Sequence, residues 1–498
     1  MSTQSDQQAA FVPPPSGDML GHPKALWMLF SAEFWERFCY YGMRAILAIY
    51  VAEAFFSDLS EGDAKAQASL TYGGYTSLVY ATGILGGFVA DRILGYRRSI
   101  MVGGTLMAIG MFLLMVKSLP IFLLGLSVIV VGNGLFKPNI SSMVGKLYAP
   151  GDTRRDSGFI IFYMGINLGA FFSPIICATV IGKIYGAQYG FLAAGVGMIF
   201  GIMVFQLLTG MLGEIGKSPV GRESPITIVQ VVLGCLLLIP TIYFLLSKDE
   251  NILGFILTLL MLGLAGYFVF SGLRSEDKKQ LSRYVAMLIL FSANILFWAL
   301  FEQAGSSLNF LAKEFVTSPF HFSLFQSFNA FFIVTLAPVF ALLWPWLDKR
   351  SLNPSIPMKF AFALIGVGLG FLILVLTIKS VGPSGKIAWY ILGLTYLFHT
   401  ISELCLSPIG LSMITKLAKP KEVGLAMGGW FLTTSVGNYL AGRIAALASG
   451  GSGGHDEAAS SIDQYAVVFN QLWWLGAIIG LIFLVISPLV NKLMHGVK

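Results

Sequence analysis

The run IFLLGLSVIVV, residues 121–131, decides the fold class of this chain. It carries no charge, and it lacks the polar–apolar alternation of strands in a membrane β-barrel. Apolar runs of about 20 residues recur along the sequence, each long enough to cross a hydrocarbon layer of about 30 Å. Because backbone groups in lipid must be hydrogen-bonded within their own segment, we expect these runs to be transmembrane helices.

The composition supports the same class. Of 498 residues, 56% are hydrophobic and only 11% are charged, whereas soluble domains carry about 25% charged residues. So few charges cannot cover a water-facing surface, and the expected surroundings are a lipid bilayer. The net charge of +7 would point to nucleic acid in a soluble protein. Here the distribution of Lys and Arg explains it, and we expect no nucleic-acid partner.

We predict fourteen spans, and an even number places both termini on one side of the membrane. Lys and Arg number 21 on the side of the termini and 7 on the opposite side, and four lie within spans. Positive residues gather in cytoplasmic loops, so we expect cytoplasmic termini. The predicted spans cover residues 26–55, 69–93, 97–117, 119–148, 155–181, 187–210, 226–246, 251–273, 282–312, 321–347, 358–379, 386–415, 422–449 and 465–490.

The start of the chain and the cysteines carry little functional signal. Residues 1–25 are polar and proline-rich without a signal-peptide core, which predicts a disordered cytoplasmic tail. Four cysteines fall inside apolar runs at no metal-like spacing, and buried thiols behave as small apolar side chains. We therefore predict neither a disulfide nor a metal site for Cys39, Cys177, Cys235 and Cys405.

The first span carries ionisable residues where lipid is expected. Glu33, Glu36, Arg37, Tyr40 and Arg44 follow helical spacing and form one stripe. Charges at this depth cost a few kcal/mol each on insertion scales and mark function by default. We expect the stripe to line a hydrated cavity between helices. The alternative is an inter-helix salt bridge without substrate contact.

The fourth span buries Lys137 next to Pro138. The proline frees the carbonyl four residues earlier and loosens the helix beside a cation. An unpaired buried lysine loses its proton, so Lys137 needs an acidic partner, and Glu33 or Glu36 is the obvious candidate. A purely structural ion pair is the alternative.

The second half of the chain supplies acids. Glu302 and Glu403 have no cation three or four positions away on their own helices. Their counter-charges must come from the cations of the first half or from a cationic ligand. A cavity between a cationic half and an acidic half would suit a zwitterion.

Other polar and aromatic residues in the spans have two interpretations. Tyr163 and Asn167 share a helix face, and Asn167 serves equally well as glue between helices or as a ligand contact. His399 is typical of a hydrogen-bonded packing residue, and Arg443 of a side chain that snorkels to the outer interface. Aromatic residues form a pocket wall or simple packing, namely Tyr80, Trp430 and Phe431.

Several of these motifs resemble the proton-dependent oligopeptide transporter (POT/PTR) family of the major facilitator superfamily, bacterial type. The first-span sequence Glu33-x-x-Glu36-Arg37-Phe38-x-Tyr40-Tyr41-Gly42 resembles the family's first-helix motif. Two further stretches resemble its signature regions, and the resemblance extends over residues 26–490. The matching residues are Gly86-Gly87-x-x-Ala90-Asp91, Phe162-Tyr163-x-x-Ile166-Asn167-x-Gly169, Lys137, Phe301-Glu302-Gln303, Asn329 and Ser402-Glu403.

The resemblance implies an all-α major facilitator fold of fourteen transmembrane helices. It implies an N-terminal six-helix bundle at 26–210, an inserted helix pair at 226–273 and a C-terminal six-helix bundle at 282–490. A weak internal duplication agrees with two related bundles: the acid–base turn near Asp91 and Arg92 has a counterpart at Asp348 and Lys349.

The resemblance also implies proton-driven import of di- and tripeptides by alternating access, in a bacterial inner membrane. Protons are the only coupling ion expected, with no cofactor, no enzyme activity and no obligate protein partner. The implied roles are peptide-carboxylate binding by Arg37, Arg44 and Lys137; binding of the amino terminus and backbone by Asn167, Asn329 and Glu403; side-chain pockets at Tyr40, Tyr41, Tyr80, Trp430 and Phe431; further substrate contacts at Tyr163 and Glu302; and proton coupling by Glu33, Glu36 and Glu302 together with Arg37 and Lys137.

A mechanism follows as a hypothesis. A proton on Glu33 or Glu36 weakens its hold on Arg37 or Lys137, and the freed cation captures the peptide carboxylate. Arg44 and Glu302 bridge the two bundles and close the outer gate.

The rival functions are a proton-driven exporter and a carrier of an anion such as nitrate. A membrane enzyme or a channel would need a nucleophile–base pair, a metal site or a continuous polar pore, and the sequence contains none of these.

Overall fold

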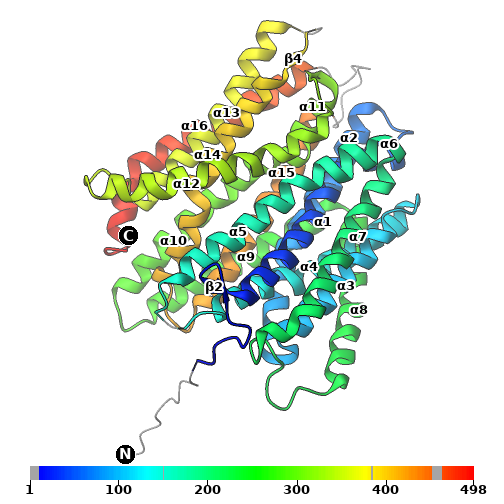
Figure 1. Cartoon of the computed structure of the whole chain (residues 1–498). Coiled ribbons are helices and arrows are strands. Elements are labelled where there is room, and N and C mark those ends of the chain that lie inside the picture. The colour runs from blue at the N-terminus through cyan, green and yellow to red at the C-terminus, as the bar shows by residue number, and fades with distance from the viewer. Residues whose placement is uncertain (1–10, 150, 383–384, 451–461, 498) are drawn as a thin grey trace, which may run out of the picture.

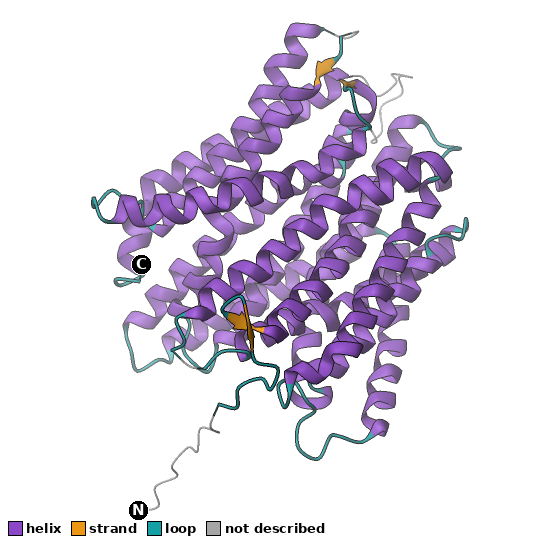
Figure 2. Ribbon diagram, viewed as in Figure 1, coloured by secondary structure: helices purple, strands orange, loops and turns teal. Residues whose placement is uncertain are grey.

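The computed structural model describes residues 11–149, 151–382, 385–450 and 462–497, and these fold into an all-α protein of the major facilitator type. Figures 1 and 2 show long helices running side by side, with very short strands only at the loop ends. The helices of the first half are α1 (Lys24–Phe55), α2 (Glu61–Val89), α3 (Tyr96–Leu113), α4 (Leu119–Lys146), α5 (Arg154–Ser173), α6 (Lys183–Tyr185) and α7 (Ala187–Leu208).

The remaining helices follow in the same up-and-down order. They are α8 (Pro225–Ser247), α9 (Glu250–Leu273), α10 (Lys279–Phe301), α11 (Ser307–Phe315), α12 (Phe328–Asp348), α13 (Ile356–Val381), α14 (Trp389–Leu417), α15 (Val423–Ala448) and α16 (Ile462–Leu493). Shorter elements are the π-helical η1 (Ala90–Leu94) and η2 (Pro174–Gly182), the 3-10 turns η3 (Thr209–Leu212), η4 (Glu302–Gly305) and η5 (Phe322–Ser327), and the strand pairs β1 (Asp18–Met19) with β2 (His22–Pro23) and β3 (Val316–Thr317) with β4 (Ile387–Ala388).

The fourteen predicted spans correspond to the helices of the structure. Within the described residues, twelve helical stretches are long and apolar enough to cross a membrane. The third and thirteenth predicted spans correspond to α3 and α15, which complete the set. The predicted start of the second span, residue 69, is wrong because α2 begins at Glu61. The extra turns are stabilised by Lys65, whose buried ammonium lies 2.7 Å from Glu61 and 2.6 Å from Glu314.

The prediction of a disordered tail over residues 1–25 needs a correction. Residues 1–10 lie outside the described part of the chain, but Asp18–Met19 and His22–Pro23 pair as an antiparallel hairpin. His22 is buried, and its Nδ1 lies 2.8 Å from the Tyr148 hydroxyl. Arg154 adds an ion pair of 2.8 Å to Asp18. Sequence composition missed the contacts of His22 and Asp18 with Tyr148 and Arg154 because these partners lie more than a hundred positions away.

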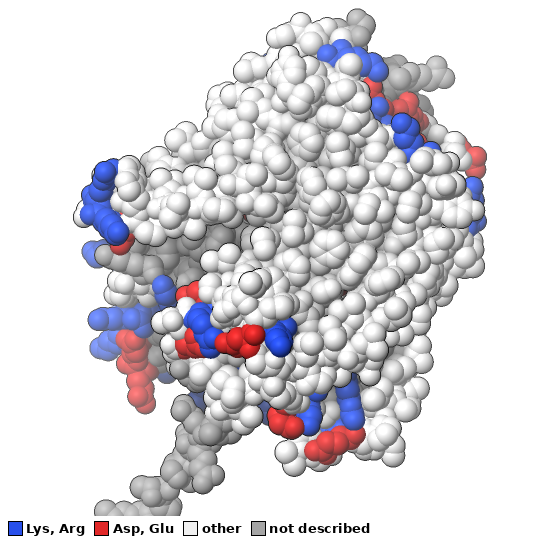
Figure 3. Space-filling model, viewed as in Figure 1, with Lys and Arg blue, Asp and Glu red and all other residues white. Residues whose placement is uncertain are grey.

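Helices α1 and α16 fix the orientation of the molecule. The beginning of α1 and the end of α16 lie on the same side (Figure 1); we call this the terminal side and the opposite one the distal side. On the face shown in Figure 3, charged side chains gather at the two ends and leave an uncharged band between them. Such a band fits the hydrocarbon layer of a bilayer.

Two groups of helices pack around α1 and α13. Helix α1 contacts α2, α5 and α7, and α3 packs on α4 and α7. In the second group α13 packs on α14 and α16, and α10 on α13 and α15. We call them the N-terminal and C-terminal bundles; the sequence boundaries assigned to them above stay a prediction.

Helices α2 and α15 form a long seam between the bundles. A Cβ atom added to Gly73 would lie 2.6 Å from the Cα of Gly442, so only glycine permits this approach. One turn farther along α2, the hydroxyls of Ser77 and Ser435 lie 2.9 Å apart. Small side chains at such crossings allow close van der Waals packing in lipid.

The helix predicted over 282–312 is interrupted in the structure. Helix α10 ends at Phe301, η4 follows, and α11 begins at Ser307. At this break Gly305 permits the close approach of Tyr72, because a Cβ there would lie 1.9 Å from the Tyr72 hydroxyl. The interruption places Glu302 at the end of a helix, facing the N-terminal bundle.

Candidate functional site

The charged stripe of α1 forms a compact ion cluster. The Arg37 Nε lies 3.2 Å from Glu33 Oε1 and also contacts Glu36 Oε2. All three side chains are buried. Asn133 of α4 donates a hydrogen bond of 2.9 Å to Glu36 Oε1. One guanidinium therefore serves two carboxylates, which leaves this cluster with an excess of negative charge.

The two carboxylates differ in how well they are satisfied. Both oxygens of Glu36 have a donor, one from Arg37 and one from Asn133. Glu33 Oε2 is buried and has no hydrogen-bond partner among the described residues. An unpartnered buried carboxylate oxygen is unfavourable when ionised, so Glu33 is the acid of the cluster that gains most from a proton.

Lys137 does not form the ion pair predicted from the sequence. Glu33 and Glu36 are both engaged by Arg37, and among the described residues no carboxylate forms an ion pair with Lys137. Its ammonium lies 4.4 Å from the centre of the Tyr80 ring, a cation–π contact. Lys137 is half-buried, so its charge is available to a ligand.

A second ion pair joins the two bundles. Arg44 Nη2 lies 2.7 Å from Glu302 Oε2, and Arg44 Nε donates a hydrogen bond of 2.6 Å to the Tyr72 hydroxyl. Both charged side chains are buried. The predicted counter-charge for Glu302 from the first half is thus present. Breaking a buried pair by removing one partner costs about 3–5 kcal/mol.

Further contacts close the distal side around this pair. Asn309 of α11 donates to the Ala45 carbonyl at 3.1 Å, and the Thr179 and Ser323 hydroxyls lie 2.9 Å apart. Lys65 and Glu314 connect α2 to α11 at 2.6 Å. Lys313 and Glu53 form another ion pair there. The two bundles are therefore held together beyond Arg44.

Glu403 has a polar neighbour but no cation. Asn329 Nδ2 donates to Glu403 Oε2 at 2.8 Å and lies 3.1 Å from the Thr400 hydroxyl. Among the described residues Glu403 forms no ion pair, and it is half-buried. Arg44, one of the cations considered as its counter-charge, is engaged by Glu302.

Polar side chains become more exposed toward the terminal side on three helices. On α5, Asn167 is 4% exposed and Tyr163 is 38% exposed. On α4, Asn133 is buried and Lys137 half-buried; on α14, His399 is buried and Glu403 half-buried. The face between the bundles is thus reached from the terminal side.

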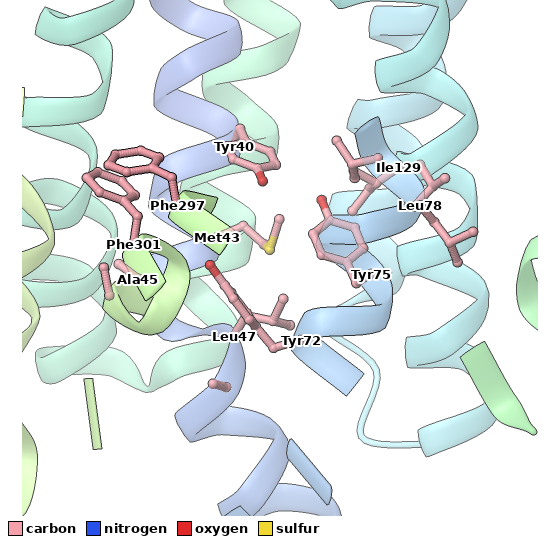
Figure 4. Close-up of a cluster of buried hydrophobic side chains, with 14 of the residues drawn as sticks. Tyr40, Met43, Ala45, Leu47, Tyr72, Tyr75, Leu78, Ile129, Phe297 and Phe301 are labelled. Carbon is pink, nitrogen blue, oxygen red and sulfur yellow. The ribbon is translucent and has the colours of Figure 1, made fainter. Parts of the chain in front are cut away.

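A small cavity lies deeper in. It measures about 20 Å³ and is lined from both bundles, by Tyr41, Arg44, Asn329 and Tyr396 among others. A cavity of this size holds about one water molecule. Figure 4 shows buried side chains of the helices near it, among them Tyr40 of α1, Tyr72 of α2 and the neighbouring rings of Phe297 and Phe301 of α10.

The remaining predicted residues fall into two groups. Tyr40 and Tyr41 meet edge to face at 5.3 Å beside Arg37 and Arg44, within the site. Asn167 donates to the Tyr163 carbonyl at 2.9 Å, on its own helix. Phe431 is half-buried. Trp430 is only 4% exposed, packed on Phe291 and Phe360, and offers little surface to a ligand in this conformation.

His399 has the packing role expected of it. Its Nε2 lies 3.1 Å from the Val367 carbonyl, and its ring packs 5.0 Å from Phe371. The four cysteines are buried and unpaired. Within the described residues, no group of three His, Cys, Asp or Glu side chains is arranged to hold a metal.

Sequence reasoning missed two residues that position the charges. Asn133 holds Glu36, and Tyr72 holds Arg44. A polar residue between two glycines, as in Gly132-Asn133-Gly134, is a signal of close helix contact in membranes, and it could have identified Asn133. Tyr72 is not flanked by glycine on both sides and gave no such signal.

Comparisons with known proteins agree on one family. The model of the POT family matches residues 97–458. The uncharacterized transporter YclF of Bacillus subtilis is 36% identical over 506 residues, covering 99% of both chains. A di-/tripeptide transporter of Lactococcus lactis is 35% identical, covering 96% of this chain and 98% of its own. The crystal structure of a peptide transporter POT in complex with sulfate superposes with a TM-score of 0.82 at 34% identity, covering 99% and 100% of the two chains.

The bridge between Arg44 and Glu302 leads to a stability prediction. Arg44→Leu and Glu302→Leu each leave one buried charge unpaired, so each should lower the unfolding free energy by about 3–5 kcal/mol. The double variant should lose clearly less unfolding free energy than the two single variants lose together. Thermal unfolding in detergent measures the stability of the wild type, the two single variants and the double variant. Additive losses would contradict a direct interaction between the two side chains.

Proposed function

This chain belongs to the POT family, and from that premise we propose that it is a proton-coupled symporter that imports di- and tripeptides by alternating access. It is a multi-pass membrane transporter and not an enzyme. The observation that carries the proposal is a separation of charge: Lys137 of the N-terminal bundle and Glu403 of the C-terminal bundle are both half-buried, and no protein ion pair is described for either. A zwitterionic peptide supplies the missing partner for each.

The peptide carboxylate goes to the basic residues of the first bundle. Lys137 is the first contact because only the Tyr80 ring balances its charge. Arg37 joins once Glu33 or Glu36 releases it. Arg44 contributes its positive field while it remains paired with Glu302. A carboxylate held by two or three cations in a site shielded from water binds more strongly than the same pairs in water.

The peptide amino terminus goes to Glu403. Asn329 already donates to one oxygen of this carboxylate, which fixes its orientation and leaves the other oxygen for an ammonium group. Asn167 and Asn329 offer amide groups to the peptide backbone. The side chains of the peptide contact aromatic residues around the site, namely Tyr40, Tyr41, Tyr80, Tyr163, Trp430 and Phe431.

Proton coupling begins at Glu33. Its Oε2 lacks a partner, so protonation removes an unfavourable buried charge and at the same time weakens the hold on Arg37. The freed guanidinium then binds the peptide carboxylate, so proton and peptide favour each other's binding. Glu302 takes part when the distal side opens, because its proton releases Arg44.

The proposed orientation places both termini in the cytoplasm of a bacterium, with the protein in the inner membrane. The distal side, where Arg44 with Glu302 and Lys65 with Glu314 join the bundles, then faces outward. A membrane potential of 100 mV contributes about 2.3 kcal/mol per charge, which alone supports about 50-fold accumulation for one proton per peptide.

Uptake of labelled dialanine into proteoliposomes tests the function. An imposed inward proton gradient should drive accumulation above the equilibrium level, and unlabelled dipeptide should compete. Collapse of the gradient with a protonophore is the control. Gradient-driven efflux without peptide competition would favour an exporter, and uptake of nitrate that dipeptides do not inhibit would favour an anion carrier.

Neutral variants of the two acids separate coupling from binding. In Glu33→Gln, accumulation driven by a pH gradient should disappear, since the side chain no longer takes up a proton. Exchange of labelled for unlabelled dialanine across the membrane should continue. Glu36→Gln should lose accumulation in the same way and also bind peptide differently, because it disturbs both Arg37 and Asn133. Accumulation that persists in Glu33→Gln would contradict its role.

Glu403→Ala tests recognition of the amino terminus. In this variant dialanine should inhibit the uptake of labelled substrate at least tenfold more weakly, which corresponds to about 1.4 kcal/mol. Inhibition of that uptake by N-acetylated dialanine should be nearly unchanged. Competition against labelled substrate in the wild type and the variant measures both. An equal loss for the free and the acetylated peptide would count against Glu403.

A further inference from the structure

We propose that the inserted pair α8–α9 is a tether between the two bundles: each arm moves with a different bundle, and the turn at Lys248 and Asp249 bends as the bundles rock. Helix α8 contacts α4, α2 and η1, whereas α9 contacts chiefly α10 and α15. The two arms, α8 and α9, have few contacts with each other. In Figure 1, α8 lies at the outer edge of the N-terminal bundle.

The base of α8 is fastened to the N-terminal bundle. Arg97 Nε donates to the Ile215 carbonyl at 2.7 Å, in the linker that leads to α8. Arg98 donates to the carbonyl of Glu223 at 2.5 Å, and the Ser218 hydroxyl donates to the Leu94 carbonyl at 2.7 Å. The two arginines in the first turn of α3 thus bind the linker.

One face of α8 continues this attachment through the bilayer. Its buried side chains recur about every four residues, which is the stripe of a helix packed on one side. The helix that it contacts most is α4. The stripe consists of Thr227, Val231, Cys235, Ile239 and Ile242.

The end of α9 is fastened to the C-terminal bundle. Glu422, at the start of α15, accepts hydrogen bonds from Ser271 at 2.6 Å and from Tyr267 at 3.2 Å. Lys419 donates to the Ser271 carbonyl at 2.9 Å. Phe268 is fully buried against the Tyr284 ring, 4.9 Å away. The terminal-side end of α9 is therefore attached to α10 and to the α14–α15 turn.

The turn between the arms lies over the seam of α2 and α15 on the distal side. A cavity of about 50 Å³ separates the turn from the seam, lined by Thr71 of α2, Leu246 and Lys248 of α8, Leu253 of α9 and Tyr439 of α15. This space leaves room for the turn to bend. Beyond it, Arg443 of α15 donates to Asn251 of α9 at 3.1 Å.

The inserted pair is attached to both bundles at the terminal side and turns at the distal side, and this arrangement limits how the bundles move. When the bundles separate at the terminal side, the arm ends must separate with them, because each is hydrogen-bonded to its own bundle. The length and stiffness of the pair then limit the opening. This role goes beyond the proposed peptide transport and does not depend on which solute is carried.

Distances between spin labels test the tether. Cysteines at Ile226 of α8 and Leu273 of α9 report the arms, and cysteines at Thr105 of α3 and Leu425 of α15 report the bundles. All four positions are exposed, and the buried native cysteines are replaced by alanine. Double electron–electron resonance is measured for the pairs 226–273, 105–425, 226–105 and 273–425. The protein is compared without ligand, with dialanine at acid pH, and as Arg44→Ala, which removes the distal bridge.

The tether predicts that the 226–273 distance shifts in the same direction as the 105–425 distance, while the two pairs within one bundle stay constant. An unchanged 226–273 distance during a shift of 105–425 would overturn it, as would movement of either arm against its own bundle or the absence of any bundle shift. If Arg44→Ala shifts both cross-bundle pairs and dialanine shifts neither, the tether stands and the proposed function fails.

An anchor variant provides a second, independent readout. Glu422→Ala removes the acceptor for Ser271 and Tyr267, so it should broaden the 273–425 distance distribution and leave 226–105 unchanged. Glu276→Ala, an exposed acid in the loop after α9, is the matched control and should change neither. Equal distributions in Glu422→Ala and the wild type would contradict the anchor.

Discussion

A charge in the middle of a bilayer needs a partner, and the arrangement of the whole protein depends on how that need is met. The ion pair of Arg44 with Glu302 is the clearest case. Each residue alone would be a buried, unpaired charge in a helix of its own bundle. Together they hold the two bundles against each other on the distal side. The break after α10 and the close approach at Gly305 bring the carboxylate into reach.

The other intramembrane charges are paired less completely, and this difference gives the site its chemistry. Arg37 is shared between two carboxylates of its own helix, one of which keeps an unpartnered oxygen. Lys137 lies on an aromatic ring and Glu403 beside an amide. In the proposed mechanism, these are the positions where a proton or a zwitterion lowers the free energy by supplying the missing charge. Fully paired charges would make a stable protein without a transport site.

The places of the paired and unpaired polar residues also explain why the bundles are joined on the distal side and why the site is reached from the terminal side. Distal contacts at Arg44, Asn309 and Lys65 join the bundles, whereas Tyr163 and Glu403 are reached from the terminal side. In the proposed mechanism, protonation and ligand binding change the pairing inside the site. The inserted helices are attached at both terminal-side ends, so they transmit the resulting movement between bundles instead of belonging to one of them.

The sequence alone was sufficient for the helices, while the site residues that it named stay predictions. Apolar length and the Lys/Arg distribution depend on local composition, so fourteen spans could be predicted. Partners across helices depend on packing that no local pattern encodes. For this reason Lys137 received the wrong partner, Tyr72 was missed, and the start of α2 at Glu61 was obscured by charges that are paired only in three dimensions.

The most direct measurement is a structure of the protein determined by electron cryomicroscopy with dialanine bound at acid pH. The account predicts the peptide carboxylate within hydrogen-bond distance of Lys137 or Arg37, and the peptide ammonium within the same distance of Glu403. A dipeptide bound in the opposite orientation, or away from these residues, would contradict it.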